Sequence, residues 1–133
     1  MHCIGRVGPP GFTGPFFDKY IFPGGYAPAM SEVFAAVEQT GLWSSDCEFW
    51  RRHYHWTLHA WRERFMAHRP EVVTMMGERF ARMWEFYLAA CEISFDIGGD
   101  MVFQLLLGPH KSAVPVVRDY IADAEKALEA RGF

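Results

Sequence analysis

The sequence predicts an α/β fold in which helices pack against a small sheet. The chain has 133 residues, half of them apolar and 17% aromatic, so it is long and apolar enough to bury the core of one domain. Segments with strand-like and helix-like patterns alternate along it, which is typical of an α/β layer. We expect a single domain over residues 1–133, with about two to three strands and four helices.

The N-terminal quarter contains a short strand and irregular segments. Residues 1–4 predict the stub of a strand. Glycine and proline dominate residues 5–15, which predicts a loop because both residue types disrupt helices and strands. The aromatic residues 16–25 end in Pro23-Gly24-Gly25, which predicts a turn. No glycine-rich nucleotide loop is found in this region.

A helix and a strand follow. Ser31 is a suitable N-cap for a helix over residues 31–40, and Gly41 suits the position after its end. Residues 42–49 predict a strand, although the alternation of apolar and polar side chains is imperfect. Further on, the apolar run at residues 101–107 predicts a strand inside a sheet that is covered on both faces.

Three amphipathic helices make up most of the remaining chain. Residues 51–69 form the first, and Pro70 ends it. Its apolar residues share one face: Tyr54, Leu58, Trp61 and Phe65. Residues 71–97 predict the longest helix, and residues 115–131 a closing one. A sheet of so few strands has open edges, so we expect a partner chain or a homo-oligomer to cover them.

Composition and charge exclude several classes of protein. The net charge of −3 gives no reason to expect nucleic acid as a partner. Three widely spaced cysteines predict reduced thiols in the cytoplasm. No signal peptide or membrane span is expected, so contact with lipid would be peripheral, at the inner face of the membrane.

His55 and His59 lie one helical turn apart but lack a third ligand, and we predict no metal site. Arginines make the first amphipathic helix basic. This basic face is either exposed to solvent or rests on the anionic headgroups of a membrane.

Four motifs resemble those of one enzyme family. They are the strand end His2-Cys3-Ile4-Gly5, the segment Lys19-Tyr20-Ile21-Phe22-Pro23-Gly24-Gly25, the segment His53-Tyr54-His55-Trp56-Thr57-Leu58-His59-Ala60-Trp61, and Arg82-Met83-Trp84-Glu85-Phe86-Tyr87-Leu88 followed by Phe103-Gln104. In this order they are similar to cyclopropane-fatty-acyl-phospholipid synthases and the related mycolic acid cyclopropane synthases.

The resemblance implies an enzyme on a seven-stranded, Rossmann-like methyltransferase fold, of which this chain would be the C-terminal portion. Such an enzyme transfers methylene from S-adenosylmethionine to a cis double bond of an unsaturated phospholipid acyl chain, through a carbocation. The resemblance assigns no residue of this chain to the S-adenosylmethionine site, so we expect the cofactor-binding half to lie elsewhere. Lipid biosynthesis at a membrane surface is the expected role.

The resemblance also assigns five site residues. In the family a bicarbonate ion acts as the base, and His2, the Ile4 backbone amide and Tyr54 match three of the groups that hold it. Phe22 and Leu58 match positions of the acyl-chain pocket. Cys3 replaces a threonine of the strand and is not the cysteine of the family's site. The residue types suit the chemistry, because aromatic faces stabilise a carbocation and donor groups bind an oxyanion.

Two alternatives to a complete enzyme stay open on the sequence alone. The chain could be a non-catalytic module that binds lipid or a partner, or a subunit that completes a separate cofactor-binding chain. Its length fits both a natural short protein and a truncated gene product.

Overall fold

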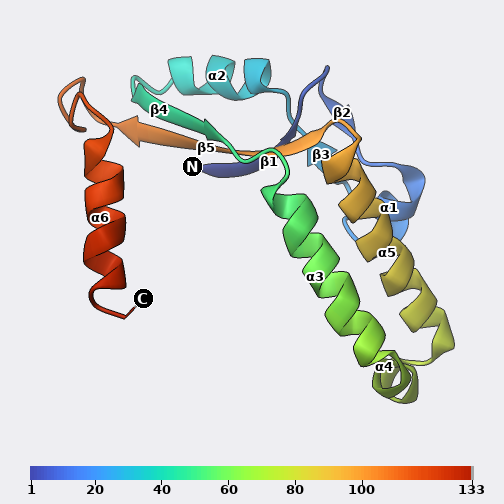
Figure 1. Cartoon of the computed structure of the whole chain (residues 1–133). Helices are drawn as coiled ribbons and strands as arrows, with labels where there is room; N and C mark the ends of the chain where they lie inside the picture. The colour runs from blue at the N-terminus through green and yellow to red at the C-terminus, as the bar shows by residue number, and fades with distance from the viewer. Residues whose placement is uncertain (133) are drawn as a thin grey trace.

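A three-stranded antiparallel sheet forms the centre of the computed structural model, which describes residues 1–132 (Figure 1). The central strand is β5 (Asp100–Gly108), flanked by β1 (His2–Arg6) and β4 (Trp43–Phe49). Its side chains explain this place, since Val102, Phe103 and Leu105 are at most 2% exposed. The three expected strands and the α/β class are confirmed.

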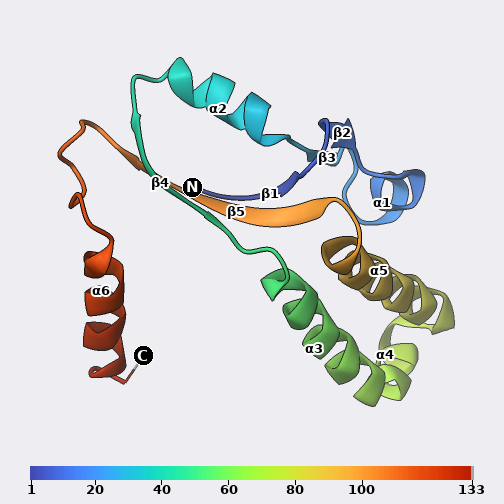
Figure 2. The same cartoon turned by 45° about the horizontal axis from the view of Figure 1, so that its top comes forward.

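Helices lie on both faces of this sheet. α2 (Met30–Glu38) crosses one face, whereas α3 (His53–Ala67) and α5 (Glu78–Asp96) extend from the other as an antiparallel pair (Figure 2). The main core lies where this pair meets β5. Its buried members come from both helices and the strand: Leu58, Leu88, Phe95 and Val102.

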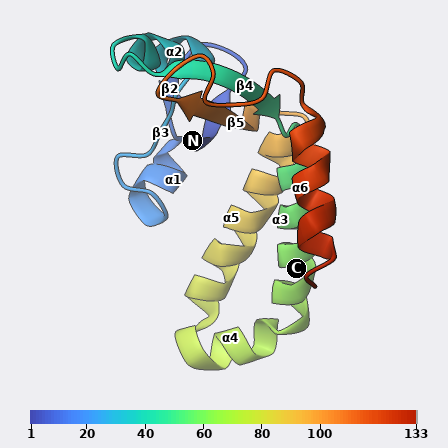
Figure 3. The same cartoon turned by 90° about the vertical axis from the view of Figure 1, so that its left-hand side faces the viewer.

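The long helix expected over residues 71–97 is broken. α4 (Arg69–Met76) ends at Gly77, and α5 begins directly after it. Gly77 has a φ of 84°, a left-handed conformation that glycine adopts without strain. α4 therefore turns across the far end of the helix pair (Figure 3). Pro70 ends α3 as expected, because it occupies the first turn of the next helix.

The segment expected to be irregular contains three short elements. β2 (Gly11–Phe12) pairs with β3 (Tyr26–Ala27), and α1 (Pro15–Tyr20) lies between them. The turn expected at Pro23-Gly24-Gly25 is confirmed, whereas the continuous loop expected over residues 5–15 is interrupted by β2 and by the start of α1. Pro15 begins a helix, because its fixed φ suits the first turn and its missing N–H has no helical acceptor there.

The last helix, α6 (Asp119–Glu129), stands apart from the other helices (Figures 1 and 2). Arg118 ties its start to β4 through Asp46 and Glu48, each at 2.7 Å. At the open side of the sheet, β1 has no neighbouring strand among residues 1–132, and only its last residue, Arg6, bonds another segment there, through a hydrogen bond from its N–H to the Pro28 carbonyl at 3.0 Å. No helix of these residues combines the length and apolarity needed to cross a bilayer.

Candidate functional site

A cavity of about 610 Å³ lies between the helix pair and the N-terminal segment. Four of the five site residues expected from the motifs line it: Ile4, Phe22, Tyr54 and Leu58. They come from β1, the turn after α1, and α3. The fold thus brings together residues that are up to 54 positions apart in the chain.

One side of the cavity is helical, and we call it the helical wall. It consists of Tyr54, Leu58, Tyr87, Cys91 and Phe95. Tyr54 and Leu58 are one turn apart on α3, so both face the cavity. Leu58 is 1% exposed, and the Tyr54 ring lies 4.9 Å from that of Phe95.

The helical stripe expected on α3 is only partly buried. Phe65 packs against the core with Tyr54, whereas Trp61 at the same stripe is 40% exposed. The stripe therefore supplies core packing at one end and a cavity wall at the other.

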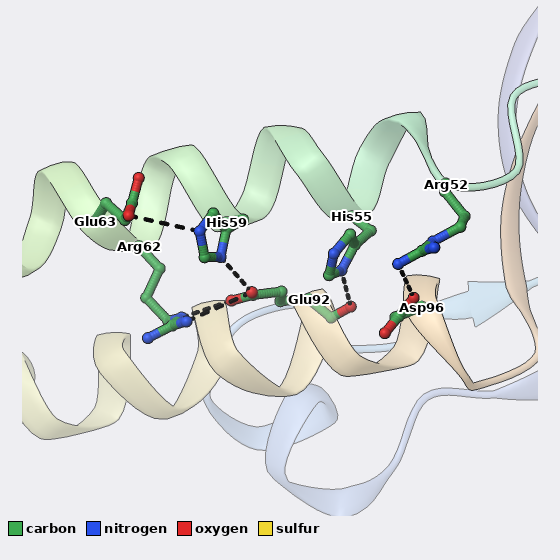
Figure 4. A network of polar contacts seen from close by, with 7 residues as sticks. All are labelled: Arg52, His55, His59, Arg62, Glu63, Glu92 and Asp96. Carbon is green, nitrogen blue, oxygen red and sulfur yellow. Dashed lines mark hydrogen bonds and ion pairs between the residues drawn. The ribbon is translucent and has the colours of Figure 1, made fainter.

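A polar network joins α3 to α5 behind the helical wall (Figure 4). Glu92 is the buried acid at its centre, 8% exposed. Its carboxylate accepts from Arg62 Nε at 2.5 Å and from His59 Nδ1 at 2.7 Å, while its backbone carbonyl lies 3.2 Å from His55 Nδ1. Arg62 holds the pKa of Glu92 below its ordinary value, and His59 adds to this, against the opposing effect of burial.

This network and the ion pairs beside it show what two histidines and several arginines in and around α3 and α4 contact, which the sequence alone did not decide. His55 and His59 both bond Glu92, and no group of three His, Cys, Asp or Glu suited to a metal ion occurs within residues 1–132. Two further arginines of this region also form ion pairs. Arg52 pairs with Asp96 at 2.7 Å, and Arg69 pairs with Glu78 and Glu85. These arginines therefore brace the helices, beyond forming a solvated face.

Two phenols, Tyr54 and Tyr87, are among the polar residues that line the cavity. In the part of the chain that the structure describes, neither the Tyr54 nor the Tyr87 hydroxyl makes a hydrogen bond within the protein. Burial, with smaller effects of Cys91 and Tyr54, raises the pKa of Tyr87 to about 12. Tyr87 thus stays protonated at neutral pH and can donate a hydrogen bond.

Motif reasoning did not assign Tyr87 or Cys91 to the site. Both fall on the apolar stripe of the long helix, which was the available signal, but a stripe does not separate a cavity wall from the core. Burial and Asp100 raise the pKa of the Cys91 thiol to about 11. The thiol is therefore protonated, which favours a packing role over a nucleophilic one.

The opposite side of the cavity, the N-terminal wall, is built from short elements. It consists of Phe12, Thr13, Phe17, Phe22 and Tyr26. Phe17 and Phe22 meet the Tyr87 ring edge-on at 6.2 and 6.0 Å. Several of these rings stay open to solvent, since Phe12 is 78% exposed, Phe22 48% and Tyr26 45%.

His2 is the expected site residue that does not line this cavity. It borders a second hollow of about 370 Å³ beside α6, where the Gln104 side-chain amide donates to His2 Nδ1 at 3.1 Å. The reason is strand geometry: His2 lies two residues from Ile4, roughly 6.6 Å along β1 and toward α6.

The Ile4 amide, in contrast, has a suitable orientation. Met1 and Leu105 exchange two hydrogen bonds, and the Val7 N–H donates to the Gly99 carbonyl at the other end of the ladder. Because such pairs alternate in an antiparallel ladder, the Ile4 N–H points away from β5, toward the open edge of the sheet. An apolar cavity with two phenols and a free amide nearby can hold an alkyl chain and donate to a small oxyanion.

Comparison with known proteins identifies relatives of this architecture. Residues 3–105 match the family described as mycolic acid cyclopropane synthetase. Tuberculostearic acid methyltransferase UfaA1 of Mycobacterium tuberculosis is 43% identical over 97 residues, which cover 71% of this chain and 23% of that protein. The cyclopropane-fatty-acyl-phospholipid synthase of Escherichia coli is 36% identical over 95 residues, 71% of this chain and 25% of that protein.

A solved structure shows the same fold. The mycolic acid cyclopropane synthase CmaA1 complexed with SAH and CTAB superposes with a TM-score of 0.70 at 22% identity. The match covers 80% of this chain and 42% of that one. This chain spans about a quarter of the length of the two curated relatives.

Proposed function

Since the chain belongs to the mycolic acid cyclopropane synthetase family, we propose that it forms the acyl-chain site of an S-adenosylmethionine-dependent lipid methyltransferase. The family includes cyclopropane synthases and fatty acid methyltransferases. The proposed substrate is an unsaturated acyl chain, and the proposed product carries one more carbon at the double bond.

One observation carries this proposal. Phe22, Tyr54, Leu58 and Ile4 surround one apolar cavity, although they come from separate elements. Phe22 and Leu58 wall the alkyl chain. The rings of Tyr54 and Tyr87 offer faces to a cationic carbon, each worth roughly 0.5–2 kcal/mol. Their hydroxyls have no other partner among residues 1–132 and can hold an oxyanion such as bicarbonate.

S-adenosylmethionine would supply the transferred carbon. A relative's structure with SAH supports this cofactor for the fold. Within residues 1–132 we assign no residue to it, and we propose that the cofactor reaches the substrate from outside the two walls. His2 would approach the oxyanion only by a rearrangement at the start of β1, since it borders the second hollow.

Between the two products that the relatives' names suggest, we propose cyclopropane formation on a phospholipid chain. Ring closure requires a base, and the Ile4 amide and Tyr54 hydroxyl lie where they could orient an oxyanion for that purpose. The exposed rings of the N-terminal wall, Phe12 and Tyr26, support peripheral contact with the membrane that carries the substrate.

A second candidate is a module that binds lipid without catalysis. It is favoured by the apolar side chains of both walls, which suit an alkyl chain whether or not a chemical step follows. In that case the cavity would bind acyl chains, but no methyl group would be transferred when a cofactor-binding partner is supplied.

The substitution Tyr54→Phe tests the catalytic proposal. Turnover is measured on vesicles of unsaturated phospholipid, with the cofactor-binding half of a relative fused or added. We expect a loss of about 10²–10³ in rate, because one donor to the oxyanion disappears while the ring and its packing remain. Thr57→Ala, a change at a half-buried residue of α3 outside the cavity lining, serves as the control. Turnover by Tyr54→Phe at the parent rate would leave Tyr54 as a packing residue.

A further inference from the structure

Arg6 places a cationic group at the cavity. It is the last residue of β1, and its half-buried side chain contributes to the lining. The guanidinium lies against β2, because a Cβ added to Gly11 would come within 2.5 Å of Arg6 Nη1. The glycine at position 11 thus leaves the space that the guanidinium occupies.

Among the residues that the structure describes, no carboxylate lies within 4.0 Å of the Arg6 guanidinium, although Asp100 also lines the cavity. Asp100 is the cross-strand neighbour of Arg6, but the Asp100 carboxylate turns toward α5 and accepts a hydrogen bond from the Ser94 hydroxyl. Within residues 1–132, the ion pairs of up to 4.0 Å involve other arginines and histidines, and none involves Arg6. A cation that is partly withdrawn from water and unpaired favours the arrival of an anion.

The position of Arg6 within the cavity indicates the form of that anion. The Arg6 guanidinium lies against Gly11, and the next residue, Phe12, is 78% exposed, so the charge is at the solvent-exposed part of the lining. Leu58 and Phe95, at 1% and 7% exposed, wall the apolar part. A cavity with a charge at its exposed part and an apolar interior matches an amphiphile with an anionic head and an alkyl chain.

We propose that Arg6 binds the oxyanion head of an acyl lipid, a carboxylate or a phosphate, whose chain occupies the cavity. Guanidinium suits both heads, since its forked N–H groups bind two oxygens of one oxyanion. The inference rests on the proposed function of the cavity. It goes further by naming the residue that selects anionic lipids, which no motif of the sequence assigned.

Binding of ligands with one tail and different heads tests the role of Arg6. The probes are oleate, 1-oleoyl lysophosphatidate and uncharged oleyl alcohol, each below its critical micelle concentration. With the full chain we expect at least one anionic probe to bind about tenfold or more tighter than oleyl alcohol. The better anionic probe identifies the head as carboxylate or phosphate. Added salt should reduce the preference.

Variants separate a binding role from a structural one. Arg6→Gln should remove the preference for the anionic head and leave the affinity for oleyl alcohol unchanged, while Arg6→Lys keeps part of it. Arg82→Gln is the matched control, because Arg82 is largely exposed and lies outside the cavity. Equal affinities for the three probes, or an equal loss for all three in Arg6→Gln, would overturn the inference while the cavity stands. If no probe binds the unsubstituted chain, the proposed function fails with it.

Discussion

The two walls of the cavity are built by different means. The helical wall is fixed on its outer side by the buried core and by Glu92, which ties α3 to α5. The N-terminal wall has a two-residue ladder between β2 and β3, and α1 has no buried residue. Edge-on contacts to Tyr87 hold it in place. The difference indicates that the helical wall is preformed, whereas the N-terminal wall is the side that can adapt to a lipid.

The largest expected difference between the walls is in stability. Leu58→Ala should lower the free energy of unfolding by about 2–5 kcal/mol, because it leaves a cavity in the core. Phe22→Ala on the N-terminal wall should cost only about 1 kcal/mol, since that ring is half exposed. Urea denaturation of both variants measures this. Equal losses would show that the two walls are equally integrated.

Glu92→Gln should have the next largest effect. The amide cannot replace the charge that Arg62 and His59 bond, and we expect a loss of about 1–3 kcal/mol in unfolding free energy. Glu63→Gln is the control. Its carboxylate is exposed and lies 3.5 Å from His59, so its loss should stay below about 0.5 kcal/mol. If both variants unfold at the same urea concentration, the network does not brace the helical wall.

The same carboxylate predicts a dependence of stability on pH. The pKa of Glu92 is lowered on folding, so its stabilising contribution is present above the pKa of an unfolded glutamate, about 4.3. It is lost as the pH falls below that value and through the folded pKa. The melting temperature should therefore fall more steeply between pH 6 and pH 3 for the parent chain than for Glu92→Gln. Parallel curves for the two proteins would contradict the coupling.

The helices of the helical wall could be predicted largely from the sequence, whereas the short elements of the N-terminal wall could not. Helical periodicity fixes which residues share a face, so the stripe with Tyr54 and Leu58 was correctly placed on a half-buried helix. The rules for glycine and proline failed, because each residue type occurs both in loops and at the ends of helices. Pro15 starts a helix within a loop-like composition, and Gly77 breaks a pattern that otherwise continues.

Long-range pairs were beyond the reach of sequence patterns. Glu92 meets His59 and Arg62 across 33 and 30 positions, which depends on how α3 and α5 dock. The place of Arg6 at the cavity depends on the register of β1 on β5 and on the close contact between its guanidinium and Gly11. Phe22, Tyr54 and Leu58 came from motif resemblance, and only the fold places them at one cavity; His2 on the same strand as Ile4 is directed elsewhere.

The central claim, that the space between the two walls binds an acyl chain, is tested most directly by filling it. Ala90 lines the cavity from α5, and Ala90→Phe would occupy space that the chain needs. We predict an affinity for oleyl alcohol at least tenfold weaker, since displacing two methylenes costs about 1.6 kcal/mol at ~0.8 kcal/mol each. Ala122→Phe on exposed α6 should bind like the parent chain. Unchanged affinity in a folded Ala90→Phe protein would contradict the account.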